Sequence, residues 1–277
     1  MTKKKITSTE DNTLETYNNL SIQVSLNGLS FCVLDTIANS ILRSDRLVFK
    51  NYISPQELQK QLEELLKAHD LIDSQFIEVV VVHNNGLFSF VPKSLFDVNE
   101  LANYLKLNVK ILANDHIAYD EIENYDMVNV YVPFVNINNY IFDLYGEFEY
   151  KHNGTALVQG LLKNPAPHKE PICYVHLDGK QLDITIITQK KLLLYNSFTI
   201  TSKEDFIYYL LFTMEQLDLD VESTKLLLFG TIEEGDDIFN LCYKYVKEVS
   251  IFIPSTVNYP LATPNQKSPD FTILSTL

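Results

Sequence analysis

Residues 172–187 have the sequence ICYVHLDGKQLDITII, and this stretch decides the fold class. Apolar residues run up to Asp178-Gly179 and resume shortly after it. Asp-Gly between two such runs predicts a tight β-hairpin, because the turn requires residues that tolerate positive φ. Residues 192–200 are again rich in strand-forming residues and predict a third strand. The stretch therefore opens a three-stranded meander.

A helix and a further strand follow this meander. Ser202 with Asp205, or Thr201 with Glu204, supplies the side chains of a helix N-cap. Residues 225–229 form a short apolar run that predicts a buried strand. The second half of the chain thus has the order strand-strand-strand-helix-strand.

The first half of the chain has the same order. Residues 20–34 contain two apolar runs that meet at Asn27-Gly28, which predicts a hairpin with a type I′ turn and positive φ at both residues. A third strand follows at residues 40–49. Ser54-Pro55-Gln56-Glu57 then caps a helix, and residues 76–82 form a β-branched strand. A unit of five elements that occurs twice predicts an internal duplication.

The segment between the two units carries further signals. We predict a hairpin at Asn84-Asn85-Gly86, a helix capped by Asp97 and Glu100, a strand at residues 128–132, and helices at about 136–145 and 155–163. Residues 164–168 contain two prolines and predict the junction between two lobes.

The sequence therefore predicts an α/β fold with two lobes, each a mixed five-stranded sheet with flanking helices. The predicted divisions are a disordered tail at 1–19, an N-terminal lobe at 20–165, a C-terminal lobe at 166–254 and a C-terminal tail at 255–277. Two interpretations of the C-terminal tail remain open. It packs on its own lobe, or it adds a strand to the sheet edge of a partner.

Composition excludes several classes of function. The net charge of −14 disfavours binding to nucleic acid or to anionic membranes, because both are negatively charged. No apolar run reaches the length that a membrane-spanning helix requires, so we expect no membrane insertion. Cys32, Cys173 and Cys242 are widely spaced among apolar neighbours, which predicts buried thiols and a cytoplasmic protein.

The order of elements resembles that of the actin, heat-shock-70 and sugar-kinase superfamily. Residues 24–33 and 176–187 are similar to its two phosphate-binding loops, residues 156–161 to its interdomain helix, and residues 226–230 to its adenosine motif. More closely, the chain resembles a bacterial family known only as domain of unknown function 3822. The resemblance implies a duplicated actin-like ATPase (ribonuclease-H-like) fold with a cleft between the lobes.

The positions that match the nucleotide site depart from the superfamily's pattern. In the first loop Ser25 stands where the family has aspartate, and Asn27 where it has glycine. In the second loop His176 replaces the first aspartate, and only one of three glycines remains, in the run Asp178-Gly179-Lys180. An ATPase of this type requires carboxylates that hold magnesium-bound water and glycines that let backbone N–H groups approach phosphate.

The remaining motifs are also incomplete. Thr231 replaces the second glycine of the adenosine motif, and the catalytic acid corresponds to Lys151 or His152, with Glu149 as a displaced alternative. Gly179, Asp183 and Gly230 match residues of the family, and Gly28 is a further position of the degenerate first loop. Asp183 either keeps a role in the site or is only a polar residue at a strand end beside a turn. We therefore assign no catalytic residue, no metal and no cofactor, and any ligand of the degenerate loops is undetermined.

The sequence favours a catalytically inactive interaction or scaffold protein with an unidentified protein partner, and self-association is a further possibility. The alternative is a divergent nucleotide- or metabolite-binding enzyme, similar to a small-molecule kinase, that uses the interlobe cleft. Two minor hypotheses concern His176: a ligand site shared with His152, and a catalytic triad with Asp183 and Ser197. The aromatic run Tyr140, Phe142, Tyr145, Phe148 and Tyr150 predicts some exposed, adhesive side chains.

Overall fold

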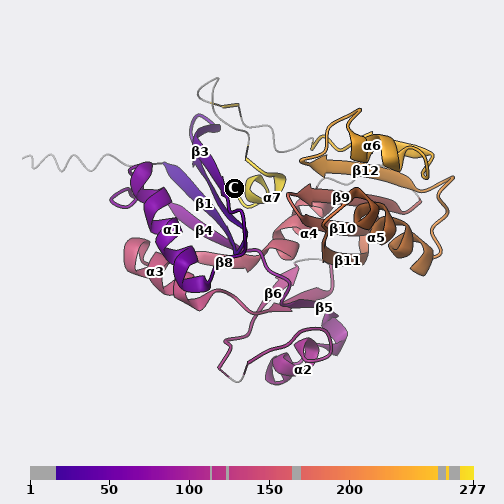
Figure 1. Cartoon of the computed structure of the whole chain (residues 1–277). Coiled ribbons are helices and arrows are strands. Elements are labelled where there is room, and N and C mark those ends of the chain that lie inside the picture. The colour runs from indigo at the N-terminus through magenta and orange to yellow at the C-terminus, as the bar shows by residue number, and fades with distance from the viewer. Residues whose placement is uncertain (1–16, 113, 123–124, 164–169, 255–259, 262–268) are drawn as a thin grey trace, which may run out of the picture.

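The computed structural model describes residues 17–112, 114–122, 125–163, 170–254, 260–261 and 269–277 (Figure 1). Two five-stranded sheets form the body of the molecule, and α4 (Asn153–Lys163) lies between them. The C-terminal helix α7 (Phe271–Leu274) packs against α4 and against two strands of the N-terminal sheet.

The N-terminal sheet combines an antiparallel meander with parallel strands. Its order is β3 (Ser40–Val48), β2 (Gly28–Asp35), β1 (Asn18–Ser25), β4 (Glu78–His83) and β8 (Glu149–His152). The meander is antiparallel, whereas β1, β4 and β8 are parallel. Leu58 and Leu62 of α1 (Pro55–Ala68) and Ile137 and Ile141 of α3 (Val135–Tyr145) pack against this sheet. This arrangement buries one face of the sheet in an apolar core.

The C-terminal sheet has the same strand order. It contains β11 (Lys191–Thr199), β10 (Gln181–Thr188), β9 (Ile172–Asp178), β12 (Lys225–Gly230) and β13 (Glu248–Ile251). Helices α5 (Lys203–Gln216) and α6 (Asp237–Cys242) supply Phe206, Leu210 and Cys242 to its core. Ser202 and Asp205 form a reciprocal capping box, which confirms the first of the two predicted caps. The predicted α/β fold with two mixed five-stranded sheets is thereby confirmed.

A small third sheet corrects one prediction. Its order is β5 (Phe88–Pro92), β7 (Met127–Tyr131) and β6 (Ala118–Ile122). Helix α2 (Leu101–Leu105) packs against β5 and β7, and η1 (Lys93–Leu95) and η2 (Val98–Glu100) lie between β5 and α2 in the chain. The hairpin predicted at residues 84–86 is wrong, because β5 pairs with β7. Strand β4 already has β1 and β8 on its two edges, so no edge is left for β5.

The first hairpin forms where predicted, but its turn differs. Ser25 pairs with Gly28, so Leu26 and Asn27 form the turn. Neither Asn27 nor Gly28 has positive φ, and the predicted type I′ turn is wrong. Gly28 is required for a different reason, because a Cβ there would lie 2.8 Å from the carbonyl oxygen of Leu47. In the second hairpin Gly179 does adopt a positive φ of 60°.

The chain ends differ in what the structure describes. Strand β1 begins at Asn18, two residues before the predicted start, and residues 1–16 of the predicted tail lie outside the described residues. The predicted junction at 164–168 also lies outside them. Residues 271–274 form a buried helix and not a strand. Asp270 caps this helix by accepting a hydrogen bond from the Thr272 N–H.

Two predictions about side chains can be compared with the structure. All three cysteines are free and buried. Of the aromatic run at 140–150, Phe142 is 60% exposed, whereas the other four rings are partly buried and pack against the N-terminal core. Among the described residues, no helix has the length and apolar character needed to cross a bilayer.

Candidate functional site

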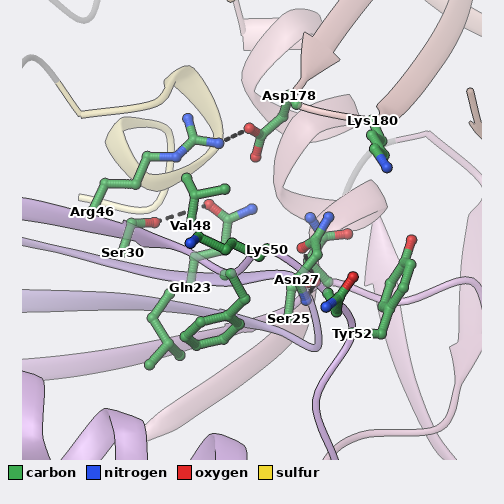
Figure 2. Close-up of a pocket in the computed structure, with 16 residues that line it drawn as sticks. Gln23, Ser25, Asn27, Ser30, Arg46, Val48, Lys50, Tyr52, Asp178 and Lys180 are labelled. Carbon is green, nitrogen blue, oxygen red and sulfur yellow. Dashed lines mark hydrogen bonds and ion pairs between the residues drawn. The ribbon is translucent and has the colours of Figure 1, made fainter. Parts of the chain in front are cut away.

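The two hairpins that carry the degenerate loops face each other across the lobes (Figure 2). Between them lies a cavity of about 360 Å³, here called the hairpin cavity. Its walls come from both lobes: Gln23, Ser25, Asn27, Gly28, Leu29, Ser30, Arg46, Val48, Phe49, Lys50, Asn51, Tyr52 and Asn84 on one side, and Asp178, Gly179 and Lys180 on the other. The structure thus brings together six of the predicted loop positions in one cavity: Ser25, Asn27, Gly28, Asp178, Gly179 and Lys180.

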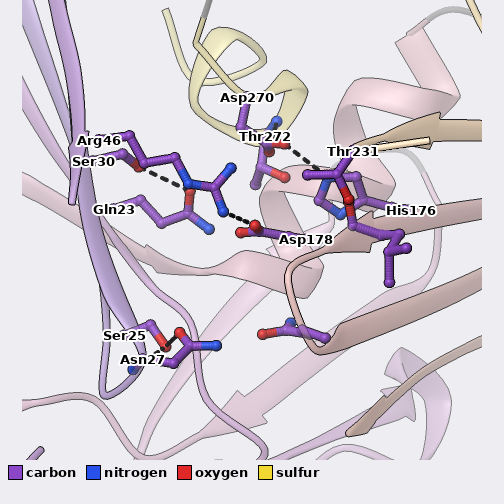
Figure 3. Close-up of polar contacts among 12 residues, drawn as sticks. Gln23, Ser25, Asn27, Ser30, Arg46, His176, Asp178, Thr231, Asp270 and Thr272 are labelled. Carbon is purple, nitrogen blue, oxygen red and sulfur yellow. Dashed lines mark hydrogen bonds and ion pairs between the residues drawn. The ribbon is translucent and has the colours of Figure 1, made fainter. Parts of the chain in front are cut away.

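An ion pair crosses the cleft beside this cavity. Arg46 of β3 pairs with Asp178 at the end of β9 (Figure 2). Arg46 also lines a second cavity of about 420 Å³, the tail cavity, together with Gly230, Thr231, Asp270 and Phe271. The Arg46–Asp178 pair therefore lies where the two cavities approach each other (Figure 3).

Ser25, at the first position of the first loop, forms a local hydrogen bond. Ser25 Oγ donates to Asn27 Oδ1 at 2.5 Å, and Ser25 is only 8% exposed. A family aspartate at this place would present a carboxylate to magnesium-bound water, whereas Ser25 presents a hydroxyl that is already used.

His176 is almost fully buried between the carboxylates of Asp183 and Asp270. Figure 3 shows its contact with Asp270. Its Nδ1 is 3.3 Å from Asp183 Oδ2, and its Nε2 is 2.8 Å from Asp270 Oδ2. Burial alone would lower the pKa of His176, but the charge of Asp270 and the hydrogen bonds to both carboxylates raise it to about 10. The imidazole is therefore charged at neutral pH, with both N–H groups donating to carboxylates.

Asp270 responds in the complementary direction. Burial alone would raise the pKa of this carboxyl group, but the adjacent His176 charge holds it well below its usual range. Because Asp270 belongs to the C-terminal tail, the pair ties this tail to β9, far away in the sequence.

Asp183 is the aspartate that the sequence predicts to match the superfamily pattern, and its oxygens accept hydrogen bonds from several groups of this chain. It is 1% exposed. Besides His176, it accepts hydrogen bonds from Gln181 Nε2 at 3.1 Å and from Tyr195 Oη at 3.2 Å. Asn153 Nδ2, at the start of α4, lies 3.5 Å away. The carboxylate is therefore not accessible to a ligand in the hairpin cavity.

The adenosine-motif residues are held against β9. Thr231 N–H and Oγ1 both donate to the Leu177 carbonyl, at 2.8 Å and 3.1 Å. Gly230 has a φ of 88°, and a Cβ there would lie 2.2 Å from the same carbonyl oxygen. Retention of glycine at position 230 is thus explained by the close approach of two strands of this chain.

The residues that match the catalytic acid, Lys151 and His152, and the alternative Glu149 lie away from the hairpin cavity. Lys151 Nζ lies 3.4 Å from Glu149 Oε2, and both line a third cavity of about 420 Å³ together with Asp120. His152 is buried, its Nε2 is 3.0 Å from the Asn85 carbonyl, and its Nδ1 accepts from Gly154 N–H. None of the three residues lines the hairpin cavity.

The two minor hypotheses about His176 do not fit this geometry. A metal requires a free lone pair on each ligating imidazole, but both nitrogens of His152 and of His176 already have partners. No group of metal-ligating side chains occurs among the described residues. In the triad hypothesis, His176 would face Ser197 with its second nitrogen, but that nitrogen faces Asp270.

Some residues of the cleft were not found from the sequence. Arg46, Lys50 and Asp270 lie outside every motif, and Asn84 was predicted only as part of a turn. The roles of these residues depend on contacts between distant segments. One local signal existed, since Asp270 precedes an apolar turn in the manner of a helix N-cap.

Comparisons with known proteins agree with this architecture. A model of the family described as protein of unknown function DUF3822 matches residues 7–249. The chain belongs to this family. Among solved structures, a Bacteroides thetaiotaomicron protein with actin-like ATPase fold and unknown function is similar, with a TM-score of 0.77 and 22% identity over 87% of this chain and 93% of that chain.

Two further structures are similar at lower identity. The PilM-PilN type IV pilus biogenesis complex matches with a TM-score of 0.51 and 12% identity, over 83% of this chain and 87% of that chain. The ethanolamine utilization protein EutJ from Carboxydothermus hydrogenoformans has a TM-score of 0.50 and 9% identity, over 93% and 88%. These likenesses show the actin-like ATPase fold for this DUF3822 chain and nothing about its activity. No curated protein matches the sequence.

Proposed function

We propose that this DUF3822 chain is a catalytically inactive interaction or scaffold protein of the cytoplasm that kept the actin-like fold and lost the chemistry. One observation carries the proposal: Asp183, the retained aspartate, lies buried against a charged His176 that also binds Asp270. A carboxylate in that position cannot also hold magnesium-bound water, because its oxygens and its access are both taken.

The surroundings of the cleft support the same conclusion. The carboxylate of Asp178 would repel a triphosphate, and in the structure it forms an ion pair with Arg46. Lys151 and Glu149 pair with each other in a separate cavity, so the displaced acid Glu149 is not placed to orient an attacking water at the hairpins. Phosphoryl transfer depends on positioned metal and charge, and the loss of both removes most of its driving interactions.

An exposed aromatic surface on α5 supports an interaction role. Tyr208 is 60% and Phe212 44% exposed, and their rings stack with centroids 5.9 Å apart. Exposed aromatic side chains of this kind are enriched where proteins bind each other. The similar fold in the PilM-PilN complex is consistent with this role. Three buried thiols, Cys32, Cys173 and Cys242, support a reducing cytoplasm.

The organisation of the chain belongs to the same proposal. The identical strand order of the two large sheets supports an internal duplication, with lobes at residues 20–165 and 166–254. Helix α4 and the C-terminal residues from 269 onward then join the lobes through buried contacts, so the lobes form one binding body.

A thermal-shift experiment tests the inactive cleft. Mg-ATP and Mg-ADP are added to the purified full-length chain, with an active sugar kinase as the positive control. A site filled at 100 times its dissociation constant stabilises a protein by about 2.7 kcal/mol, which raises the melting temperature by several degrees. We expect no saturable shift, and a clear shift with Mg-ATP would contradict the proposal.

Affinity purification followed by mass spectrometry tests the interaction. The wild-type chain is compared with a Tyr208→Ser/Phe212→Ser variant and with a matched Tyr119→Ser/Phe142→Ser variant, whose aromatic rings are also exposed. We expect a specific partner that the first variant loses and the second retains. Light scattering against concentration separates self-association from a foreign partner, and no partner in any sample would oppose the interaction role.

A second candidate function is a divergent metabolite-binding enzyme that uses the interlobe cleft. The observation in its favour is the hairpin cavity, which is open and lined by residues of both lobes. The same thermal-shift series with sugars and Mg-ATP decides between the two. Consumption of ATP that depends on an added sugar would favour the enzyme.

A further inference from the structure

The hairpin cavity has a charge opposite to that of the whole chain. The chain carries a net charge of −14. The walls of this cavity contain three cationic side chains, Arg46, Lys50 and Lys180, and one carboxylate, Asp178. A local reversal of charge inside a concave site concentrates anions there.

The two lysines are available for a ligand. Arg46 and Asp178 pair with each other, which leaves Lys50 and Lys180 as the uncompensated charges. Neither lysine has an ion-pair partner in the part of the chain that the structure describes. Lys50 belongs to the N-terminal lobe and Lys180 to the C-terminal lobe (Figure 2).

A buried amide in the wall also lacks a partner. Asn84 lines the cavity, is only 4% exposed, and has no hydrogen-bond partner for Oδ1 among the described residues. An unsatisfied buried acceptor costs about 1–3 kcal/mol. Asn84 lies directly after β4 and its backbone N–H donates to the Val24 carbonyl, so its backbone is fixed. A ligand with a hydroxyl or amino group can supply the missing donor.

The size of the cavity limits the ligand. A volume of about 360 Å³ lies at the lower end of the range of small-molecule sites, which is about 300–1,000 Å³. The Arg46–Asp178 pair lies on the side that leads toward the tail cavity, where a longer ligand would have to extend. The cavity therefore suits a ligand smaller than a nucleotide.

We propose that the hairpin cavity binds a small dianion that also carries a hydroxyl or amino group, such as a hydroxy-dicarboxylate or a small phosphate ester, without a metal ion. Lys50 and Lys180 contact its anionic groups from opposite lobes, and Asn84 Oδ1 accepts from its hydroxyl or amino group. The ligand touches both lobes and thereby stabilises one arrangement of the cleft.

The test is a ligand titration of the full-length chain in EDTA at constant ionic strength, followed by thermal shift and calorimetry. The probes are malate, succinate as its matched analogue without the hydroxyl, and glycerol 3-phosphate. We expect saturable binding of malate or glycerol 3-phosphate, and the responding probe identifies the carboxylate or the phosphate class. If malate responds, succinate is expected to bind more weakly.

Variants locate the site. A Lys50→Met/Lys180→Met variant is expected to raise the dissociation constant by about tenfold or more, because two charge-assisted contacts are lost. The matched control is Lys110→Met/Lys244→Met, which removes the same charge from exposed positions on the two lobes outside the cavity and leaves the dissociation constant unchanged. Equal weakening in both variants would overturn the site.

If none of the three probes binds, this inference is overturned and the proposed function still stands. A saturable response to Mg-ATP alone, with the three metal-free probes inactive, overturns both.

Discussion

The two halves of the cleft are built differently. Beside the tail cavity, the C-terminal helix α7 packs between the lobes, and a charged His176 is held between Asp183 and Asp270. Around the hairpin cavity, Lys50 and Lys180 have no partner among the described residues. One half is a structural joint between the lobes, and the other remains open to a ligand.

The two cavities therefore differ in how their charged residues are paired. Deep burial of charge is tolerated only when ions are paired and hydrogen-bonded, and all three groups of the joint meet that condition. Such a joint need not stabilise the fold more than apolar residues would, but removing one member leaves an uncompensated charge. Substitutions in the joint are therefore expected to lower the free energy of unfolding more than substitutions in the open half.

Asp270→Asn is expected to have the largest effect. The variant removes the charge opposite His176 but keeps a side chain that can cap α7. Breaking a buried pair in this way costs about 3 kcal/mol of the free energy of unfolding. Urea denaturation measures this cost, and the control Asp143→Asn, at an exposed residue, is expected to change it by less than about 0.5 kcal/mol. Equal free energies of unfolding for the two variants would contradict a structural role for the Asp270–His176 pair.

The pH dependence of stability tests the same pair without a mutation. The pKa of His176 is raised in the folded state to about 10, from the ordinary histidine value of about 6.5. The folded chain thus binds the proton more tightly, so the stabilisation is fully present below pH about 6.5 and is lost as the pH rises toward 10. Between pH 6.5 and 8 the free energy of unfolding is expected to fall by about 2 kcal/mol from this group.

The comparison with Asp270→Asn isolates this contribution from other titrating groups. We expect the fall between pH 6.5 and 8 to be clearly smaller in the variant, because His176 has then lost a negative neighbour. Parallel curves for wild type and variant would show that the pair does not control the titration.

Gly160→Ala tests the fit of the C-terminal helix on α4. A Cβ at this position would lie 2.7 Å from Ser275 Cβ and 3.0 Å from Phe271 Cζ. Overpacking of this kind costs about 1–3 kcal/mol, and the better helix propensity of alanine returns about 1 kcal/mol. We expect a net loss of about 1 kcal/mol by urea denaturation. Gly86→Ala, where a Cβ meets no atom within 4 Å, is the control and should be nearly neutral.

The Arg46–Asp178 pair should contribute the least. The side chains are 33% and 17% exposed, so solvent screens their attraction. A double-mutant cycle with Arg46→Ala and Asp178→Ala is expected to give a coupling energy of about 0.5 kcal/mol in stability. A coupling of several kcal/mol would place this pair with the buried joint and remove the contrast between the two halves.

The fold was predictable because its signals are local. Alternation and turn residues located the hairpins around residues 25–28 and 178–181, and the caps at Ser54 and Ser202 located α1 and α5. The error at residues 84–86 arose because a turn signal does not tell which strands pair. That choice depends on the two edges of β4, which β1 and β8 occupy.

The site was less predictable because its contacts are long-range. The losses at Ser25 and His176 were visible in the sequence, but the partners of His176 were not. Asp270 is 94 residues away and reaches His176 only because α7 packs between the lobes. Asn84 was assigned to a turn, and its unpartnered oxygen becomes evident only beside the cavity.

The central claim is that the cleft no longer binds a nucleotide, and calorimetric titration of Mg-ATP into the full-length chain tests it most directly. We expect no saturable heat up to about 1 mM nucleotide, a concentration that reveals any site with a binding free energy stronger than about 4 kcal/mol. Saturable one-site binding of Mg-ATP, lost on mutation of Asp183, would contradict it.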